Sequence, residues 1–243
     1  WRNNYDKAEY YAKGVLGIAS QIDNPNYLRY AHNMLASIYE SRGDFSQSIQ
    51  HFEQVIRNTR LVGKDDYKYL VQSYVNLGIT YGKDSLYREA ISALEKALEL
   101  ERKYDLKLTH DKAEIFAYLG RNYHKINDEE SALTYFKRAK SLMNGDSGKH
   151  LTKSPTVFYE LADYYLDKRE YDIAIQYYLQ SLDHLAKKDD SGSQGYTDLV
   201  STTHLHLNGL AMAYKLRGLN ETPMDTVSIQ LALRNFVLAD SLL

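Results

Sequence analysis

The sequence has no cysteine, only 3 prolines in 243 residues, and no long uninterrupted apolar run. The absence of cysteine excludes disulfides, thiol nucleophiles and thiolate metal sites, although it leaves the redox compartment undecided. Because proline breaks the interior of a helix, so few prolines leave room for long helices. No segment approaches the roughly 18 apolar residues that a membrane-spanning helix needs.

An excess of one charge is also lacking. The chain carries 30 basic and 32 acidic residues, which gives a net charge of -2, and it contains no long basic run. We therefore expect no nucleic-acid binding by this region, since binding of phosphates needs a basic surface. Hydrophobic residues make up 44% of the chain and charged residues 26%, as in an ordinary folded domain.

The stretch from Ala113 to Ala139 sets the pattern of the chain. Its apolar residues recur at steps of three and four on both sides of a polar turn at residues 125–128, which is typical of two amphipathic helices. Gly120 and Ala132 are small where the two helices would cross closely, and Phe136 is large enough to fill the space beside the crossing. The pattern predicts a helix, a tight turn and a second helix.

This unit recurs with a period of 42 residues. The recurring positions are a small residue on the first helix, an aromatic residue three positions later, and a small residue on the second helix. An internal repeat of this size indicates an array of stacked units. The three positions are occupied by Ala36, Gly78, Gly120 and Ala162; by Tyr39, Tyr81, Tyr123 and Tyr165; and by Ser48, Ala90, Ala132 and Ala174.

These motifs resemble tetratricopeptide repeats, whose first helix carries Leu-Gly or Leu-Ala followed by Tyr. The pairs Leu77-Gly78 and Leu119-Gly120 match this pattern, and the resemblance covers nearly the whole chain. The period departs from the commonest form, which repeats about every 34 residues. The resemblance implies an all-α fold, a right-handed superhelical solenoid of antiparallel helix pairs, similar to the long-period arrays of bacterial sensor and regulatory proteins.

We expect a single solenoid over residues 1–243. Residues 1–22 would form the second helix of a truncated repeat, and residues 199–243 an irregular last repeat. Because the chain does not begin with methionine and both ends fall within predicted helices, we expect further segments on both sides. Predicted helix caps are Asp84 or Ser85, Ser154 before Pro155, and Thr222 before Pro223. The regular repeats are expected at residues 29–58, 71–102, 113–143 and 155–187.

No motif indicates catalysis, a metal or a cofactor. The loop at residues 145–149 resembles a phosphate-binding loop, but Met143 stands at its first glycine position and His150 at its Ser/Thr position, so we interpret it as a turn. His204 and His206 are two residues apart and point to different sides of a helix, which is unsuited to chelation of one ion. We expect no enzyme activity, no metal and no cofactor.

The candidate binding site follows from the packing pattern. If the side of the first helix with Leu119, Gly120 and Tyr123 packs inward, a neighbouring row of residues is exposed on a concave surface. In the resembled family this row commonly holds a protein or peptide ligand, and Asn and Gln can both donate to and accept from a peptide backbone. Most of the 23 tyrosines are expected in the core. The partner-binding candidates are Tyr30, Asn33 and Ser37; Gln72 and Asn76; Tyr118, Arg121 and His124; Tyr159 and Asp163; and Asn208.

Two interpretations of this row remain open. Arg121 can bind a carboxylate of a ligand, or it can pair with Glu160, Asp163 or Asp167 of the next repeat. Binding of Hsp90-type tails is disfavoured, because Asn76 alone matches the charged clamp that the resemblance would require.

The function that the resemblance implies is a protein- or peptide-binding scaffold. It would be the sensory or interaction region of a larger bacterial signalling or transcription-regulatory protein. In the alternative, a short peptide in the groove changes the shape of the superhelix. The cell envelope is the favoured compartment, and the cytoplasm is the alternative.

Overall fold

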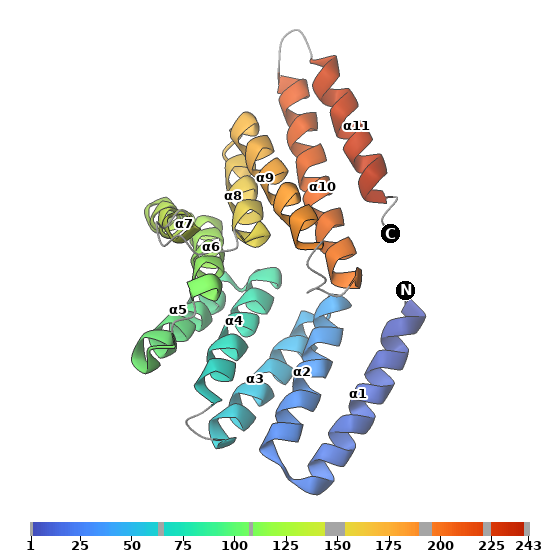
Figure 1. Ribbon diagram of the computed structural model, residues 1–243, viewed down its shortest axis with the longest axis vertical. Helices are drawn as coiled ribbons and strands as arrows, with labels where there is room; N and C mark the ends of the chain where they lie inside the picture. Colours follow the sequence, from blue (N-terminus) through green and yellow to red (C-terminus); the bar gives the residue numbers. More distant parts are fainter. Residues whose placement is uncertain are drawn as a thin grey trace. The chain divides into compact units, whose positions relative to one another are not determined.

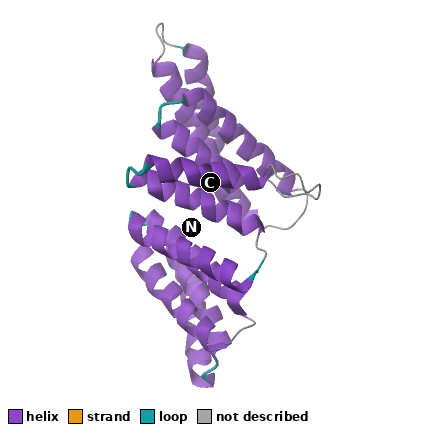
Figure 2. Ribbon diagram, turned by 90° about the vertical axis from the view of Figure 1, so that its left-hand side faces the viewer, coloured by secondary structure: helices purple, strands orange, loops and turns teal. Residues whose placement is uncertain are grey.

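The computed structural model describes residues 2–62, 66–106, 109–143, 154–189, 196–220 and 225–240, and this part of the chain consists of helices and turns without a strand (Figure 2). The predicted all-α fold is confirmed. The loop at residues 145–149 and the cap at Thr222 lie outside the described residues. The helices, labelled in Figure 1, are α1 (Arg2–Ile22), α2 (Pro25–Ser41), α3 (Phe45–Val62), α4 (Tyr67–Lys83), α5 (Tyr87–Tyr104), α6 (Thr109–Lys125), α7 (Glu129–Met143), α8 (Pro155–Asp167), α9 (Tyr171–Asp189), α10 (Tyr196–Asn220) and α11 (Thr226–Asp240).

The chain divides into two compact units, each built from sequential antiparallel helix pairs. Unit 1 comprises residues 1–108 and 125–129, and unit 2 comprises residues 109–124 and 130–243. In unit 1, α1 packs on α2, α2 on α3, α3 on α4, and α4 on α5; in unit 2, α8 packs on α9, α9 on α10, and α10 on α11. The arrangement of the whole chain as one solenoid stays a prediction.

Small residues lie at the helix crossings, as the sequence predicts. A Cβ atom added to Gly120 would lie 2.9 Å from the ring of Phe136, and one added to Gly78 would lie 2.7 Å from the side chain of Leu94. Ala36 and Ala162, at the same position of their repeats, are fully buried. These contacts let the two helices of a pair approach closely enough to bury a continuous apolar seam.

The turns within the helix pairs share a left-handed residue at the 42-residue period. Gly43, Ser85, Asn127 and Arg169 have φ values of 78°, 62°, 62° and 63°. The predicted capping of α5 by Asp84 or Ser85 is therefore wrong. Ser85 is the left-handed turn residue, and Leu86 precedes the helix without a side-chain cap. The backbone amide of Leu86 donates to the Tyr81 carbonyl at 2.9 Å, and this hydrogen bond closes the turn.

Other helix starts also differ in detail from the expectation; α4 and α6, for example, each begin four residues before the expected 71 and 113. α2 begins at Pro25, before the expected start at residue 29, because the Asn24 side chain accepts from the backbone amide of Asn26 at 2.9 Å. Ser154 does precede Pro155 at the start of α8, but its hydroxyl makes no cap hydrogen bond. It donates to Glu114 instead and so connects α8 to α6 within unit 2.

Candidate functional site

In unit 1 the candidate residues lie on two first helices that run side by side. Glu40 of α2 accepts from the Lys83 ammonium at 2.9 Å, which ties α2 to α4. The Thr80 hydroxyl lies 3.4 Å from the same carboxylate, but its nearer acceptor is the Asn76 carbonyl at 3.0 Å. The candidates beside this contact are exposed or half-exposed. We call them the first-helix face of unit 1: Tyr30, Asn33, Ser37, Gln72 and Asn76.

The two amides of α4 on this face are already oriented by each other. Gln72 Nε2 donates to Asn76 Oδ1 at 2.9 Å, one helical turn apart. Among the described residues these two side-chain amides make no further hydrogen bond. The Gln72 oxygen and the Asn76 nitrogen therefore remain to accept from and donate to a peptide backbone.

Arg29 supports one edge of the first-helix face. Its side chain is buried, Nη1 donates to Asp66 Oδ1 at 2.9 Å, and its guanidinium lies 4.3 Å from the ring centre of Tyr69 and 5.1 Å from that of Tyr30. Such cation–π contacts hold the two half-exposed rings in place. The sequence pattern missed this cluster, because Asp66 lies in the segment between repeats, where the periodicity carries no information.

Tyr30 also borders an apolar hollow of about 260 Å³ between α1 and α2. Exposed apolar side chains of α1 continue from this hollow toward the start of the helix. The hollow is lined by Val15, Ile18, Ala19, Ile22, Tyr27 and Tyr30.

In unit 2 Arg121 is held by a buried carboxylate. Its Nη1 lies 3.0 Å from Glu160 Oε1, and Glu160 is only 3% exposed. Burial is the largest single effect and lowers the pKa of Arg121, but the combined electrostatic effect of Glu160, Asp163 and the neighbouring tyrosines outweighs it, so the pKa is raised. Arg121 is thus a charged residue committed to an internal ion pair, one of the two interpretations that the sequence left open.

The other candidates of unit 2 also contact neighbouring side chains. The Tyr178 hydroxyl donates to Asp163, and the ring of Tyr159 stacks on His206 with centroids 4.6 Å apart. His124 Nε2 lies 3.4 Å from Asp167 Oδ2. The amide of Asn208 lies 3.1 Å from the His204 ring, and Tyr118 lies under the Arg121 guanidinium. Most of this row therefore binds other helices of the unit.

Ser181 and His206 form a buried pair that resembles the serine and histidine of a catalytic triad. Ser181 Oγ lies 3.0 Å from His206 Nδ1, yet it donates its one hydrogen to the Pro155 carbonyl at 2.6 Å. The hydroxyl must therefore accept from Nδ1–H, so the imidazole cannot take the serine proton. With exposed fractions of 0% and 2%, the pair has a structural role between α8, α9 and α10.

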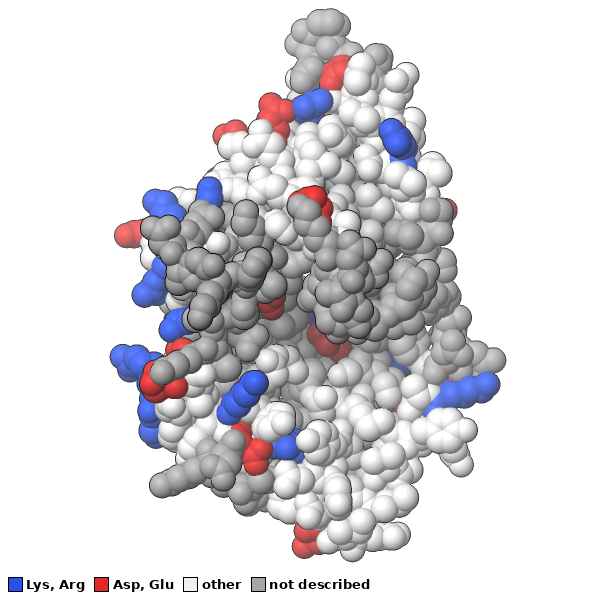
Figure 3. Space-filling view, viewed as in Figure 1, with Lys and Arg blue, Asp and Glu red and all other residues white. Residues whose placement is uncertain are grey.

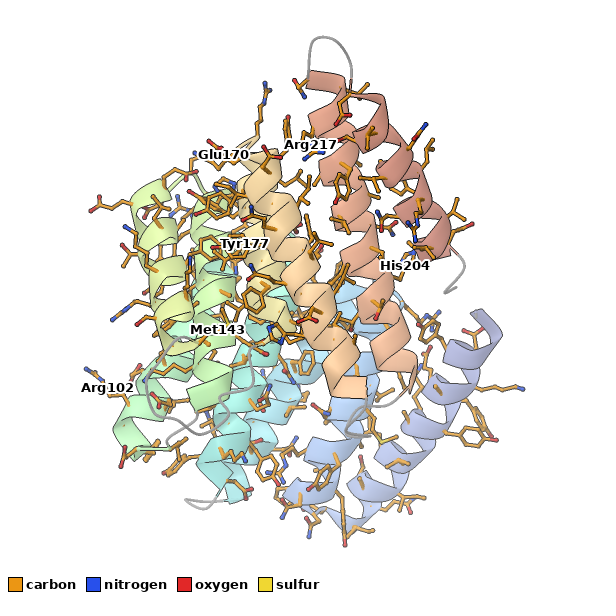
Figure 4. The ribbon with its side chains drawn as sticks, turned by 45° about the horizontal axis from the view of Figure 1, so that its top comes forward. Arg102, Met143, Glu170, Tyr177, His204 and Arg217 are labelled. Carbon is orange, nitrogen blue, oxygen red and sulfur yellow. The ribbon has the colours of Figure 1, made fainter. Side chains whose placement is uncertain are left out.

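Charged groups elsewhere connect helices or lie dispersed on the surface. Figure 4 labels Arg217 on α10, whose guanidinium binds Asp172 of α9 at 2.9 Å and Asp225, just before α11. On the face drawn in Figure 3, acidic and basic side chains are scattered over a mainly uncharged surface. Within the described ranges, no helix is long and apolar enough to cross a membrane, and no group of three or more metal-ligating side chains occurs.

Three segments match family models that all describe the tetratricopeptide repeat. The matched residues are 31–63, 69–144 and 155–183, which together make up more than half of the chain. A search of curated proteins gave no match.

Solved structures share the fold at low sequence identity. BtubC (BKLC) from P. vanneervenii is 19% identical, with a TM-score of 0.62 over 98% of this chain and 90% of its own. Aspartyl phosphate phosphatase F from Bacillus subtilis is 17% identical, with a TM-score of 0.64 over 98% of this chain and 56% of its own. A signal transduction ATPase with a tetratricopeptide repeat sensor from Pyrococcus horikoshii is 13% identical, with a TM-score of 0.53 over 89% of this chain and 37% of its own.

Proposed function

This chain belongs to the tetratricopeptide repeat family, and we propose that it is a non-catalytic scaffold that binds a protein or peptide on the first-helix face of unit 1. The observation that carries the proposal is the oriented amide pair of Gln72 and Asn76 beside Asn33 and the Arg29-supported ring of Tyr30. These groups are accessible and held before any ligand arrives. A receptor with such preorganised groups loses little conformational entropy on binding.

The contrast between the two units supports assignment of the site to unit 1. In unit 2 the corresponding row is occupied by the Arg121–Glu160 ion pair and by the contacts of Asp163 and Tyr159. A ligand carboxylate would have to compete with Glu160 for Arg121. Breaking such a buried pair costs several kcal/mol.

The test is a peptide-array screen followed by titration of the best binders. Replacing both Gln72 and Asn76 with alanine should weaken binding at least about tenfold, since each lost hydrogen bond contributes about 1 kcal/mol. The matched control replaces Gln176 and Gln180 with alanine, because they form another exposed pair one turn apart, on α9. Equal loss in both double variants, or no loss in the first, would contradict the assignment.

We further propose that the chain is the input region of a larger bacterial signalling or transcription-regulatory protein. Support comes from two structural neighbours, a phosphatase of aspartyl phosphate and an ATPase with a repeat sensor, and this chain covers 56% and 37% of their lengths. The test is the phenotype of a chromosomal Gln72→Ala/Asn76→Ala variant. A transcriptome unchanged relative to the Gln176→Ala/Gln180→Ala control would refute a regulatory role.

A second candidate is a peptide sensor, in which occupancy of the face changes the shape of the array. The observation that favours it is the contact of Glu40 with Lys83, since a ligand spanning α2 and α4 would lie directly against this contact. Small-angle scattering with and without a bound peptide tests the idea. An unchanged radius of gyration at saturation would exclude the sensor and favour a scaffold that binds without a change of shape.

A further inference from the structure

One position of the repeat carries an aromatic ring that stacks on the first-helix tyrosine. It lies twelve residues after that tyrosine, and Figure 4 labels one example, Tyr177 of α9. The stacked pairs have centroid distances of 5.4 to 5.6 Å and interplanar angles of 7° to 12°. They are Tyr39 with His51, Tyr123 with Tyr135, and Tyr165 with Tyr177.

Repeat two departs from this rule. The residue twelve positions after Tyr81 is Ala93, whose methyl group cannot cover a ring. Among the described residues, no aromatic ring stacks on Tyr81. In its place is an open hollow of about 590 Å³ between α4 and α5, bordered by Tyr74, Leu77, Tyr81 and Ala93. Its volume is within the range of ligand sites.

The rim of this hollow is mainly acidic. Glu89, Glu95 and Glu99 of α5 line it, together with Lys96, whose ammonium lies 2.7 Å from Glu99. Burial raises the pKa of Tyr81, and the charges of Glu53 and Glu89 raise it further. A ring entering the hollow therefore meets a negative environment, which favours basic groups beside it.

The hollow continues along α4 rather than closing. Tyr74 and Lys96 also border a second hollow of about 320 Å³, which reaches Thr59 and Arg60 of α3 and the stacked rings of Tyr67 and Tyr104. Arg60 donates to the Tyr74 hydroxyl between the two hollows. An extended chain suits such an elongated groove better than a compact small molecule does.

We propose that the hollow over Tyr81 is a docking site for an aromatic side chain of a basic peptide segment. The incoming ring takes the place that His51, Tyr135 and Tyr177 occupy in the other repeats. A lysine or arginine neighbour of the ring pairs with Glu89. The site lies on a different side of α4 from Gln72 and Asn76, so it is independent of the first-helix face.

The test is a methyl-NMR titration of the chain with the acetylated, amidated pentapeptide Lys-Gly-Trp-Gly-Lys. Saturable shifts of the Leu77 methyl groups are expected. Ala93→Tyr should weaken binding about tenfold, because its own ring then stacks on Tyr81 as in the other repeats. Ala93→Ser, which leaves the hollow open, is the matched control and should bind like the wild type. The Gln72→Ala/Asn76→Ala variant should also bind normally.

Peptide variants separate ring stacking from general attraction. Replacing Trp with Leu, or both Lys residues with Glu, should each weaken binding about tenfold. Circular dichroism checks that Ala93→Tyr is folded, and Tyr81→Leu removes the stacking surface from the other side and should lose binding equally. The proposal is overturned if the parent peptide gives no saturable shift, if both ring variants bind like the wild type, or if the Leu or Glu peptide binds as tightly as the parent.

Discussion

At the scale of single residues, the contact between Gly120 and Phe136 fixes how closely α6 and α7 approach. An added methyl group would lie 2.9 Å from the phenyl ring, which is buried and cannot move aside easily. We predict that Gly120→Ala lowers the free energy of unfolding by about 1–3 kcal/mol, although alanine is the better helix former.

Gly17 is the matched control for this prediction. It also lies within a helix, but nothing stands within 4 Å of its added methyl group. Gly17→Ala should therefore raise the free energy of unfolding by about 0.5–1 kcal/mol. Urea denaturation followed by circular dichroism measures both values, and equal shifts of the two variants in one direction would show that Gly120 is not at a tight crossing.

The helix crossings could be predicted from the sequence because a small residue recurs at each of them with the 42-residue period. The hollow over Tyr81 could not be predicted in this way. Ala36, Gly78, Gly120 and Ala162 repeat a property that the pattern search seeks, namely small size at one period. Ala93 is instead an exception at a different position of the repeat, where the other repeats carry an aromatic residue. An exception becomes visible only when the structure shows what those aromatic residues do.

At the scale of elements, the turns between paired helices depend on one left-handed residue, and three of the four described cases are not glycine. Arg169 adopts φ 63° and is exposed, so its side chain contributes little to offset the backbone cost. We predict that Arg169→Gly raises the free energy of unfolding by about 0.5–1 kcal/mol. In the opposite direction, Gly43→Ala at φ 78° should lower it by a similar amount. Urea midpoints that move the other way would exclude this account of the turns.

The same turns show where sequence reasoning stops. Ser85 is suited both to a helix N-cap and to a turn, and the sequence pattern predicts a cap at Asp84 or Ser85. The outcome depends on the hydrogen bond from the Leu86 amide to the Tyr81 carbonyl, which forms only when Ser85 is left-handed. Ser154 occupies the predicted N-cap position before Pro155, but its hydroxyl donates to Glu114 and not to the helix backbone. Helix ends are thus decided by tertiary partners as well as by local preference.

His206 makes the packing of α10 against α8 and α9 sensitive to acid. Burial lowers its pKa to about 4, against about 6.5 in an unfolded chain. Between these values the unfolded state binds more protons, so this contribution to stability is complete above about pH 6.5 and is lost as the pH falls toward 4. Burial also lowers the pKa of His32 to about 4, and that effect has the same sign in unit 1.

We predict that His206→Gln flattens part of the fall in the free energy of unfolding between pH 7 and pH 4.5. Glutamine keeps a donor for Ser181 but does not titrate. Urea unfolding at both pH values measures the slope, and the NMR titration of the His206 ring provides an independent check. A ring that titrates near pH 6.5 in the folded protein would contradict the burial argument.

At the scale of the whole molecule, the predicted binding row extends through every repeat, but its residues have different roles in the two units. In unit 1 the amides of Gln72 and Asn76 bond to each other and keep accessible atoms. In unit 2 the basic candidate Arg121 forms an ion pair with Glu160, an acidic residue of the next repeat. The sequence contained both partners of this ion pair, but it could not decide between an internal and an external carboxylate, because that choice depends on burial.

At the same scale, the 42-residue period predicts that the array behaves as one solenoid. In a solenoid each repeat is stabilised by its neighbours, so a local weakening spreads along the chain with decreasing size. We predict that Gly120→Leu, which overfills the α6–α7 crossing, lowers hydrogen-exchange protection most in α6 and α7, less in α5 and α8, and least in α2 and α11. Mass spectrometry of exchanged peptides under native conditions measures this profile. In a nearest-neighbour array, the effect has no boundary at which it can stop abruptly. Loss of protection confined to unit 2, with α5 unchanged, would therefore mean that the two units fold independently.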